Sequence, residues 1–350
     1  MRGAAPPFGS KNQGFRQSRE ADEGVGRGPG GPPHNLFMKA PMPVEEMTPG
    51  VARLRTWIAN MYLVGSPGGP WVLVDTGTRG NAAGIRDAVV QRFGRGARPE
   101  AILLTHGHRD HAGSALELAG YWDVPIYAHR LERPFLSGKS TYPPKDPMAG
   151  GAFSFLSRFF PSATVDLGAR LRDLPEGGEV PGPAGWRWHF TPGHAPGHVA
   201  FFHSDESVLL AGDACATMDL DSAMGMVAQE PRISRPPAPF TYDWDQAQRS
   251  VELLADLRPT VIGAGHGEPM SGRAVAVGLA DLARDFPEPR GRYRSEPART
   301  DETGVTFLPP PAPDPAPKIA AAVGLAAAGV AAVVALSRNK KSGVRIQNTE

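Results

Sequence analysis

Short apolar runs alternate with longer segments of helical spacing through the middle of the chain. The apolar runs that predict strands cover residues 57–64, 71–74, 101–104, 124–128, 186–190, 199–203, 207–210 and 260–263. Helical spacing covers residues 81–93, a stretch from about 114, 245–257 and 273–286. In the first of these, Ile85, Val89 and Phe93 fall on one face. Strands interleaved with helices predict an α/β domain whose chemistry lies on the loops that follow strands.

Gly and Pro concentrate near both ends of the chain and mark the boundaries of this domain. Residues 1–38 are rich in Gly, Pro, Arg and Ser without apolar periodicity, which predicts a disordered arm. The arm has no apolar run of the kind that a secretory signal peptide contains. Residues 288–317 are rich in Pro and predict a linker. The catalytic domain is therefore expected over residues 39–287.

One internal segment, residues 136–162, is rich in Gly, Pro, Ser and Phe. This composition predicts an insertion or a lid beside the site. Lys139, Tyr142 and Lys145 in this segment could contact an anionic substrate, or they could belong to a solvated loop.

An uncharged apolar segment, residues 319–336, lies near the C-terminal end. It is just long enough to span a bilayer, and it lies between Lys318 and a basic tail with Arg338, Lys340 and Lys341. The alternative is an Ala-rich soluble helix. The basic tail favours a cytoplasmic C-terminus, but no export signal is evident, so the orientation is left open. The expected location is cytoplasmic, or membrane-anchored through this segment.

Charge and cysteine content exclude several classes of function. Lys and Arg total 37 against 36 Asp and Glu, so the chain lacks the basic field that nucleic-acid binding usually needs. The single cysteine, Cys215, excludes an intrachain disulfide and a thiolate metal cluster. The expected partner is a small-molecule substrate and not a nucleic acid, while the oligomeric state is left open.

The polar run from Thr105 to Gly113 directly follows a predicted strand and is crowded with metal-capable side chains. These are His106, His108, Asp110 and His111. Zn²⁺ accepts imidazole nitrogen and carboxylate oxygen, and a catalytic site keeps one coordination position open for water. The alternative is a solvated His-rich loop, but the chain has only 10 histidines and three of them lie here. The run therefore indicates a metal site.

Three more metal-capable side chains stand at predicted strand ends. His194 lies in Thr-Pro-Gly-His-Ala-Pro-Gly-His, Asp213 follows Leu-Leu-Ala-Gly, and His266 lies in Gly-Ala-Gly-His-Gly. Neighbouring glycines let the backbone approach a ligand without a Cβ clash. Each residue alone fits an ordinary polar loop group. Together with the run at 105–113, they predict ligands of one site.

In their order along the chain, the Asp75 turn and these motifs resemble the metallo-β-lactamase superfamily of metallohydrolases, over about residues 50–285. The resemblance implies an α/β fold in the form of a four-layer αβ/βα sandwich, the metallo-β-lactamase fold. In that fold two mixed sheets pack face to face, helices lie outside, and the site lies along one edge of the sheets. The resemblance also implies that His106, His108 and His194 bind a first metal, that Asp110, His111 and His266 bind a second, and that Asp213 bridges both.

Such a pair of metals favours hydrolysis. Two Zn²⁺ ions are expected, with iron as the alternative, and they would lower the pKa of a shared water so that a bridging hydroxide attacks a carbonyl carbon. Asp110 is the expected catalytic residue, because it could move the proton. Asp75 is expected to orient a ligand histidine, and His198 fits either that role or ordinary packing. Cys215 is interpreted as a packing residue.

The Thr191–His198 motif and the aspartate at 213 are most similar to the glyoxalase II (hydroxyacylglutathione hydrolase) type, which cleaves thioesters of glutathione. After His266, however, only one helix is predicted before the linker, and the helical substrate domain of that type is not evident. We therefore expect an enzyme that hydrolyses a thioester or small ester. The alternatives are a lactonase, for which a more apolar lid is expected, an iron-containing member with redox or sulfur chemistry, and a non-catalytic membrane-tethered scaffold. The complete ligand set disfavours the scaffold.

Overall fold

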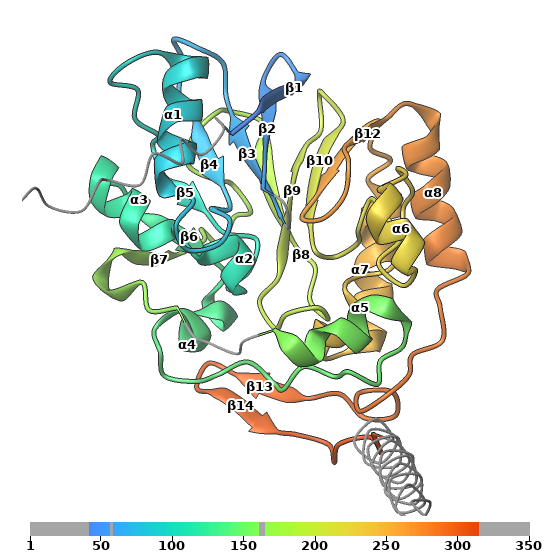
Figure 1. The fold of residues 1–350 in the computed structure, drawn as a ribbon. Coiled ribbons are helices and arrows are strands. Elements are labelled where there is room, and N and C mark those ends of the chain that lie inside the picture. The colour runs from blue at the N-terminus through green and yellow to red at the C-terminus, as the bar shows by residue number, and fades with distance from the viewer. Residues whose placement is uncertain (1–41, 57–58, 161–164, 315–350) are drawn as a thin grey trace, which may run out of the picture. The chain divides into compact units, whose positions relative to one another are not determined.

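The computed structural model describes residues 42–56, 59–160 and 165–314 of the 350-residue chain. The predicted N-terminal arm and the apolar segment 319–336 lie outside these residues, so both stay predictions. Two β-sheets face each other in the middle of the domain, and helices lie outside them (Figure 1). Among the helices of the described residues, none has the length and apolar character needed to cross a membrane.

The first sheet has seven strands that follow one another in chain order. They are β1 (Val44–Thr48), β2 (Val51–Arg55), β3 (Asn60–Val64), β4 (Val72–Val74), β5 (Ile102–Leu103), β6 (Ile126–Ala128) and β7 (Leu171–Asp173). β1 to β4 pair antiparallel, and β4 to β7 pair parallel. Parallel neighbours need a crossover, which α1 (Ala82–Phe93) and α3 (Ala115–Trp122) provide. The carboxyl ends of β4 and β5 therefore lie at the same edge of the sheet.

The second sheet has five strands in the order β12-β11-β10-β9-β8. They are β8 (Trp186–Phe190), β9 (Val199–His203), β10 (Val208–Gly212), β11 (Val261–Ala264) and β12 (Met270–Ser271). β10 and β11 are parallel, and the other neighbours are antiparallel. The crossover between β10 and β11 contains α7 (Trp244–Asp256), which begins where the Asp243 carboxylate accepts the Gln246 amide at 2.9 Å. This side-chain cap satisfies a backbone N–H that the first turn leaves unpaired.

Apolar side chains fill the space between the two sheets. Tyr62, Val74 and Leu103 of the first sheet belong to the same buried cluster as Phe201 and Leu210 of the second. Successive side chains of a strand point to opposite faces, so each sheet can turn one apolar face to the other sheet and one to its helices. This cluster fixes the two sheets against each other.

Helices bury the outer face of each sheet. Ile85 of α1 and Leu118 of α3 share a buried cluster with apolar residues of β2 to β5. On the other side, Val251 of α7 and Leu279 of α8 (Arg273–Arg284) share a cluster with apolar residues of β9 to β11. These four layers form the predicted αβ/βα sandwich, so the fold prediction is confirmed.

Shorter helices lie in the loops that connect these layers. They are α2 (Arg109–Ala112), α4 (Arg133–Leu136), α5 (Gly151–Leu156) and α6 (Ala223–Ala228). α5 falls within the segment 136–162 that the sequence predicted as an insertion or lid. Its amides at Ala152 and Phe153 donate to the carbonyls of Asp221 and Leu220, just before α6.

Strands β1 and β2 were not predicted, because charged residues interrupt their apolar spacing. Arg53 of β2 is only 3% exposed, since it pairs with Glu45 of β1 and with Glu268 beyond β11. A paired arginine can occupy a position that an unpaired charge could not. The sequence pattern alone does not reveal these distant partners.

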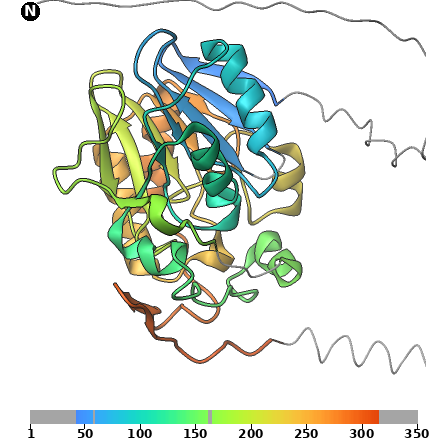
Figure 2. The same cartoon turned by 90° about the vertical axis from the view of Figure 1, so that its left-hand side faces the viewer.

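The prediction that residues 288–317 form a linker is wrong for the middle of this segment, which contains two strands. β13 (Arg299–Asp301) and β14 (Gly304–Phe307) form an antiparallel hairpin, drawn in orange at the lower edge of Figure 2. Before the hairpin, Tyr293 is buried, and its hydroxyl donates to the carbonyl of Pro144 at 2.6 Å. A buried aromatic ring holds this segment against the domain, an effect that its Pro content does not indicate.

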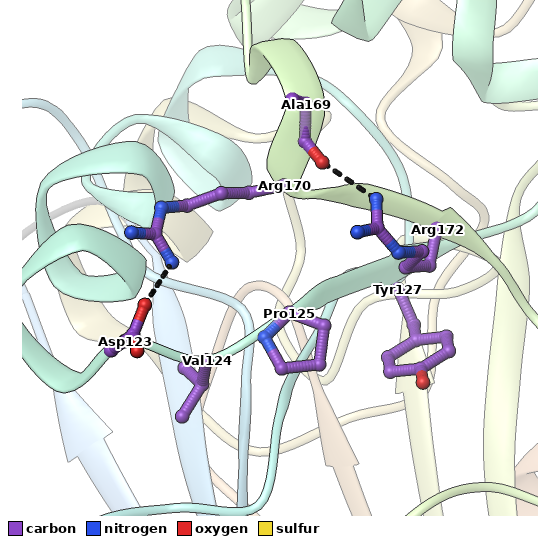
Figure 3. A pocket seen from close by; sticks show the side chains of 7 residues that line it. All are labelled: Asp123, Val124, Pro125, Tyr127, Ala169, Arg170 and Arg172. Atoms are coloured by element: carbon purple, nitrogen blue, oxygen red, sulfur yellow. Dashed lines mark hydrogen bonds and ion pairs between the residues drawn. The ribbon is translucent and has the colours of Figure 1, made fainter.

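A surface pocket lies where β6 and β7 begin (Figure 3). It is lined by Asp123, Val124, Pro125, Tyr127, Ala169, Arg170 and Arg172. Both arginines are engaged, Arg170 with Asp123 at 3.1 Å and Arg172 with the carbonyl of Ala169 at 2.6 Å. Because β5, β6 and β7 are parallel, this pocket lies at the opposite edge of the sheet from the end of β5, where the predicted ligands begin.

Replacing Ile85 by Ala is expected to lower the free energy of unfolding by about 2–4 kcal/mol, because the side chain is 0% exposed and leaves a cavity. Val90→Ala on the same helix is the matched control. Val90 is 43% exposed, so an effect below about 0.5 kcal/mol is expected. Urea unfolding followed by circular dichroism measures both variants. Equal effects would contradict the packing of α1 against the first sheet.

Candidate metal centre

Loops from both sheets meet at one edge of the sandwich. The run from His106 to His111 follows β5, Asp213 follows β10, His266 follows β11, and His194 lies between β8 and β9. The structure brings all seven predicted ligands together in two groups of three, with Asp213 grouped with His106 and His111 from both, and within each grouping the ligand atoms lie within 4.8 Å of one another. Residues that are far apart in the sequence therefore share one site.

The first group consists of His106, His108 and His194. His106 Nε2 lies 2.9 Å from His108 Nδ1, and His108 Nδ1 lies 3.0 Å from His194 Nε2. His106 and His194 are buried, and His108 is partly exposed. One cation can therefore contact a nitrogen of each ring and still be reached from outside.

Burial keeps these three imidazoles neutral. It lowers the pKa of His106 and of His194 well below the usual value. Burial also lowers the pKa of His108 to about 4, although Asp110 and Asp213 act in the opposite direction. A neutral imidazole is the form that binds a metal ion. Burial and metal binding therefore favour the same protonation state.

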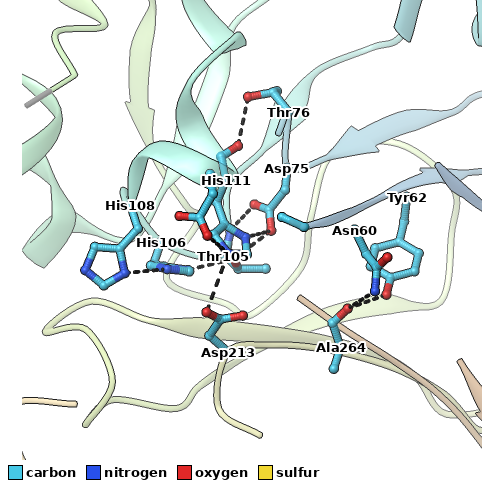
Figure 4. A network of polar contacts seen from close by, with 12 residues as sticks. Asn60, Tyr62, Asp75, Thr76, Thr105, His106, His108, His111, Asp213 and Ala264 are labelled. Carbon is cyan, nitrogen blue, oxygen red and sulfur yellow. Dashed lines mark hydrogen bonds and ion pairs between the residues drawn. The ribbon is translucent and has the colours of Figure 1, made fainter. Parts of the chain in front are cut away.

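Hydrogen bonds fix which ring nitrogen points into the site (Figure 4). Asp75 accepts the backbone amide and the hydroxyl of Thr105 at 2.9 and 2.8 Å. The Thr105 oxygen can then accept Nδ1–H of His106, 3.0 Å away, and Asp75 lies 2.9 Å from Nδ1 of His111. Both rings thus present Nε2 to the site. Asp75 has the orienting position that was predicted for it.

Asp110, His111 and His266 form the second group. Asp110 Oδ2 lies 3.8 Å from His111 Nε2 and 3.6 Å from His266 Nε2. Asp110 and His111 belong to α2, which begins directly after His108. This single helical turn places two neighbouring side chains in the second group.

Asp213 lies between the two groups. Its Oδ2 is 3.4 Å from Nε2 of His194 in the first group, and 3.5 and 3.2 Å from Nε2 of His111 and His266 in the second. Burial raises the pKa of this carboxyl, but His266 and His111 outweigh burial and hold it well below its usual range. A deprotonated carboxylate at this position can contact a cation in either group.

Buried polar atoms without partners indicate that these residues fit a cation. Within the described residues, His111 Nε2 and Asp213 Oδ1 are buried and make no hydrogen bond. Such atoms are uncommon in folded proteins, because each costs about 1–3 kcal/mol when it is left unsatisfied. A bound cation would satisfy both. Imidazole and carboxylate donors suit Zn²⁺ and also iron.

Two neighbouring residues determine where Asp213 can lie. The Nε2 of His198 accepts the backbone amide of Asp213 at 2.9 Å, and its Nδ1 lies 2.8 Å from the Thr191 hydroxyl. On the other side, a Cβ at Gly265 would stand 1.9 Å from Asp213 Oδ1 and 2.7 Å from His111 Cε1. His198 therefore orients a predicted ligand and does more than pack. The glycine before His266 permits the close approach of the loops.

A family model described as the metallo-beta-lactamase superfamily matches residues 54–266, which include all seven of these side chains. The chain belongs to the metallo-beta-lactamase superfamily. Together with its relatives, this membership identifies it as a metallo-hydrolase.

Curated relatives in the superfamily cover most of the domain. The chain is 41% identical over 241 residues to the probable metallo-hydrolase YflN of Bacillus subtilis, which covers 68% of this chain and 91% of that protein. It is 31% identical over 196 residues to the probable metallo-hydrolase YybB of the same organism, with 56% and 75% covered. A solved structure of TTHA1623 in a di-iron-bound form is 26% identical, covers 67% of this chain and 97% of that chain, and has a TM-score of 0.44.

Glu132 supports the loops of this candidate site but was not predicted from the sequence. Its side chain is fully buried. Its Oε2 accepts the amide of Gly107 at 2.8 Å, and its Oε1 accepts the amide of Gly197 at 2.7 Å. Gly107 stands between the first two predicted ligand histidines, and Gly197 is three residues after His194. One carboxylate therefore ties two of the predicted ligand loops together, and no local motif in the sequence marks it.

Two tyrosines stand beside the ring of His108. Tyr142 donates its hydroxyl to Glu132, and its ring centroid lies 4.5 Å from that of His108. The hydroxyl of Tyr242 lies 3.3 Å from His108 Nε2. Burial raises the pKa of both hydroxyls well above the usual value, so they stay protonated. The sequence placed Tyr142 in the lid and did not predict its contact with Glu132.

Cys215 lies close to Asp213 in the chain but is not turned to the site. It is buried in the cluster between the second sheet and its helices. Burial raises the pKa of its thiol to about 12, so the thiol stays protonated and packs as a small apolar side chain. This agrees with the interpretation from the sequence.

Replacing Glu132 by Gln is expected to weaken metal binding about 10- to 100-fold, the usual range for residues that support metal ligands. The amide keeps the shape of the side chain but has only one acceptor oxygen. It cannot accept the N–H groups of both Gly107 and Gly197. Competition with a chromophoric chelator measures the metal affinity.

The matched control is Glu302→Gln, because that carboxylate is 66% exposed and pairs with Arg130. Its metal affinity is expected to equal that of the unmodified chain. If Glu132→Gln lowered the thermal stability but left metal affinity unchanged, Glu132 would be a structural residue with no role in positioning the ligands.

Proposed function

We propose that the chain is a binuclear metal-dependent hydrolase that cleaves a thioester or small ester bond. The observation that carries the proposal is the position of Asp213 Oδ2, within 3.5 Å of imidazole nitrogens from both ligand groups. A carboxylate in such a position can bridge two cations, and two-metal sites are used for hydrolysis by activated water. Membership of the superfamily supports the same class of reaction.

The proposed metals are two Zn²⁺ ions, with iron as the alternative. His106, His108 and His194 would hold the first ion, Asp110, His111 and His266 the second, and Asp213 would contact both. Bound there, the ions would supply an activated water and a Lewis acid for the scissile carbonyl.

Asp110 is the proposed group for proton movement. Its side chain is 29% exposed, whereas that of Asp213 is 3% exposed. Asp110 can therefore exchange a proton with solvent while its Oδ2 stays 3.6 Å from His266 Nε2. Hydrolysis needs such a group, because the departing thiolate or alkoxide takes up a proton when its bond to the acyl carbon breaks.

A thioester is the first candidate, because the Thr191–His198 motif and the aspartate at 213 are similar to the glyoxalase II type. After α8 the described chain continues as the β13–β14 hairpin, where that type has a helical substrate domain. The proposal therefore does not include glutathione as the leaving group.

A lactone is the second candidate substrate. A lactonase is expected to have an apolar lid, and Phe153 of α5 lies within the segment predicted as a lid. Its ring centroid stands 6.4 Å from that of His266. Hydrolysis of a lactone breaks the same acyl–oxygen bond as hydrolysis of an ester, so the same residues serve both reactions.

His108→Ala and Asp213→Ala are expected to lose bound metal and to lower the hydrolysis rate by more than about 100-fold. Each variant removes a proposed metal ligand. Loss of a residue that only supports a ligand already lowers metal affinity or activity by up to about 100-fold. Elemental analysis measures the metal content, and a chromogenic thioester measures the rate.

His203→Ala is the control, because His203 lies at the far end of β9 from the site and bonds to the carbonyl of Ala184. It is expected to keep both metal and activity. Circular dichroism checks that all three variants are folded. If His108→Ala or Asp213→Ala hydrolysed the thioester at the rate of the unmodified chain, the proposal would be wrong.

A further inference from the structure

Aromatic side chains flank the metal centre on the side of α5 and of the segment before α7. We call this set the aromatic wall; it consists of Tyr142, Phe153, Phe160, Phe240 and Tyr242. The ring of Phe240 lies 5.5 Å from that of His108 in the first ligand group, and the ring of Phe153 lies 6.4 Å from that of His266 in the second. The Phe153 and Phe240 rings are 6.1 Å apart. The wall therefore extends beside both ligand groups.

The wall offers ring surface to a bound molecule. Four of its side chains are partly exposed, namely Tyr142, Phe153, Phe160 and Phe240. The hydroxyls of the two tyrosines are used inside the protein, that of Tyr142 by Glu132 and that of Tyr242 by His108. An aromatic ring without a free polar group contacts apolar groups best.

Two cations beside the wall are engaged within the protein. Lys145 donates from Nζ to the carbonyl of Phe160. Arg158 bonds to both oxygens of Asp314 at 2.9 and 3.0 Å, and its guanidinium lies 4.7 Å from the centre of the Phe155 ring. The sequence had suggested Lys145 as one contact for an anionic substrate, but its ammonium group already has a partner. These observations favour an apolar ligand on this side.

Exposed apolar side chains also lie on α5, in the turn after it and on α6. The exposed apolar side chains here are Phe155, Leu156, Phe159, Met224 and Val227. Phe153 of α5 and Met226 of α6 pack against the same buried cluster, so the two helices are neighbours (Figure 1). Apolar groups that gather on one surface are typical of a ligand-binding region. An apolar chain could therefore extend from the wall along this surface.

We propose that the substrate carries an apolar acyl group, which lies against Phe153 and Phe240 while its carbonyl carbon is at the metal centre. This inference rests on the proposed hydrolase function. In the reaction the oxygen of water bonds to the acyl carbon, the bond to the thiol sulfur or alcohol oxygen breaks, and the leaving group takes up a proton. The substrate class is an aliphatic or aromatic acyl thioester or ester, or a lactone with an apolar substituent.

The test compares kcat/KM of the metal-loaded full chain across N-acetylcysteamine thioesters of acetyl, butanoyl and octanoyl groups. The leaving group is uncharged and constant, so differences report the acyl group alone. Burial of each added methylene favours the transition state, so a rise of at least about tenfold from acetyl to octanoyl is expected. In Phe153→Ala and Phe240→Ala this rise is expected to shrink to less than about threefold. Matching series of ethyl esters and of alkyl-substituted γ-lactones separate the candidate bond types.

Two variants serve as controls. Tyr121→Ala removes an exposed aromatic side chain of α3, on the outer face of the first sheet, and is expected to keep the unmodified profile. Phe153→Leu keeps an apolar side chain and is expected to retain most of the preference for long acyl groups. Metal content and circular dichroism of each variant separate loss of the wall from loss of metal or of the fold.

The outcomes distinguish this inference from the function on which it rests. A flat profile or a preference for acetyl in an active enzyme would overturn the role of the aromatic wall and leave the hydrolase function standing. If Phe153→Ala and Phe240→Ala keep the full rise of kcat/KM from acetyl to octanoyl, the role of the aromatic wall is likewise overturned. If the metal-loaded chain hydrolyses none of the thioesters, esters or lactones, the proposed function fails, and the inference fails with it.

Discussion

The carboxylate of Asp213, buried among imidazoles from both ligand groups, is the constraint on which the rest of the site depends. A buried carboxylate is costly unless it is paired and hydrogen-bonded, yet its Oδ1 makes no hydrogen bond within the described residues. The hydrogen bond from the backbone N–H of Asp213 to His198 Nε2 fixes this position, and the absence of a Cβ at Gly265 leaves room for the carboxylate. Three Nε2 atoms face Oδ2. Two cations would complete what the protein atoms leave unsatisfied.

This constraint requires the two sheets to keep a fixed position relative to each other at the edge where the site lies. Asn60 and Tyr62 of β3 both donate to the carbonyl of Ala264, at 3.0 and 2.6 Å, just before the His266 loop (Figure 4). Glu132 ties the loop after β5 to the loop before β9. The apolar cluster between the sheets holds the layers, while these polar bonds set where the ligand loops meet. The proposed metal binding thus depends on both sheets of the sandwich, and the aromatic wall is proposed to add a preference for apolar acyl groups.

The sequence singled out the seven side chains that the structure brings together because each stands in a local pattern, either the crowded run at 105–113 or a glycine-flanked strand end. The central strands and the long helices were predictable for a similar reason, since their apolar spacing reflects burial on one or both faces. Glu132 could not be found this way, because it acts on backbone amides that are distant in the sequence. β2 was not predicted because Arg53 interrupts its apolar spacing, and the partners that allow the burial of Arg53, Glu45 and Glu268, are not adjacent to it in the sequence. The Pro content of 288–317 predicted a linker and gave no sign that the ring of Tyr293 is buried.

The most direct test of the account is anomalous diffraction from crystals of the metal-loaded chain, with data collected at the zinc and iron absorption edges. We expect two anomalous peaks roughly 3.5–4 Å apart, the usual spacing of two-metal sites. One peak should lie among His106, His108 and His194, the other beside His111 and His266, with the Asp213 carboxylate in contact with both. A single peak, or two peaks of which only one contacts Asp213, would contradict the account.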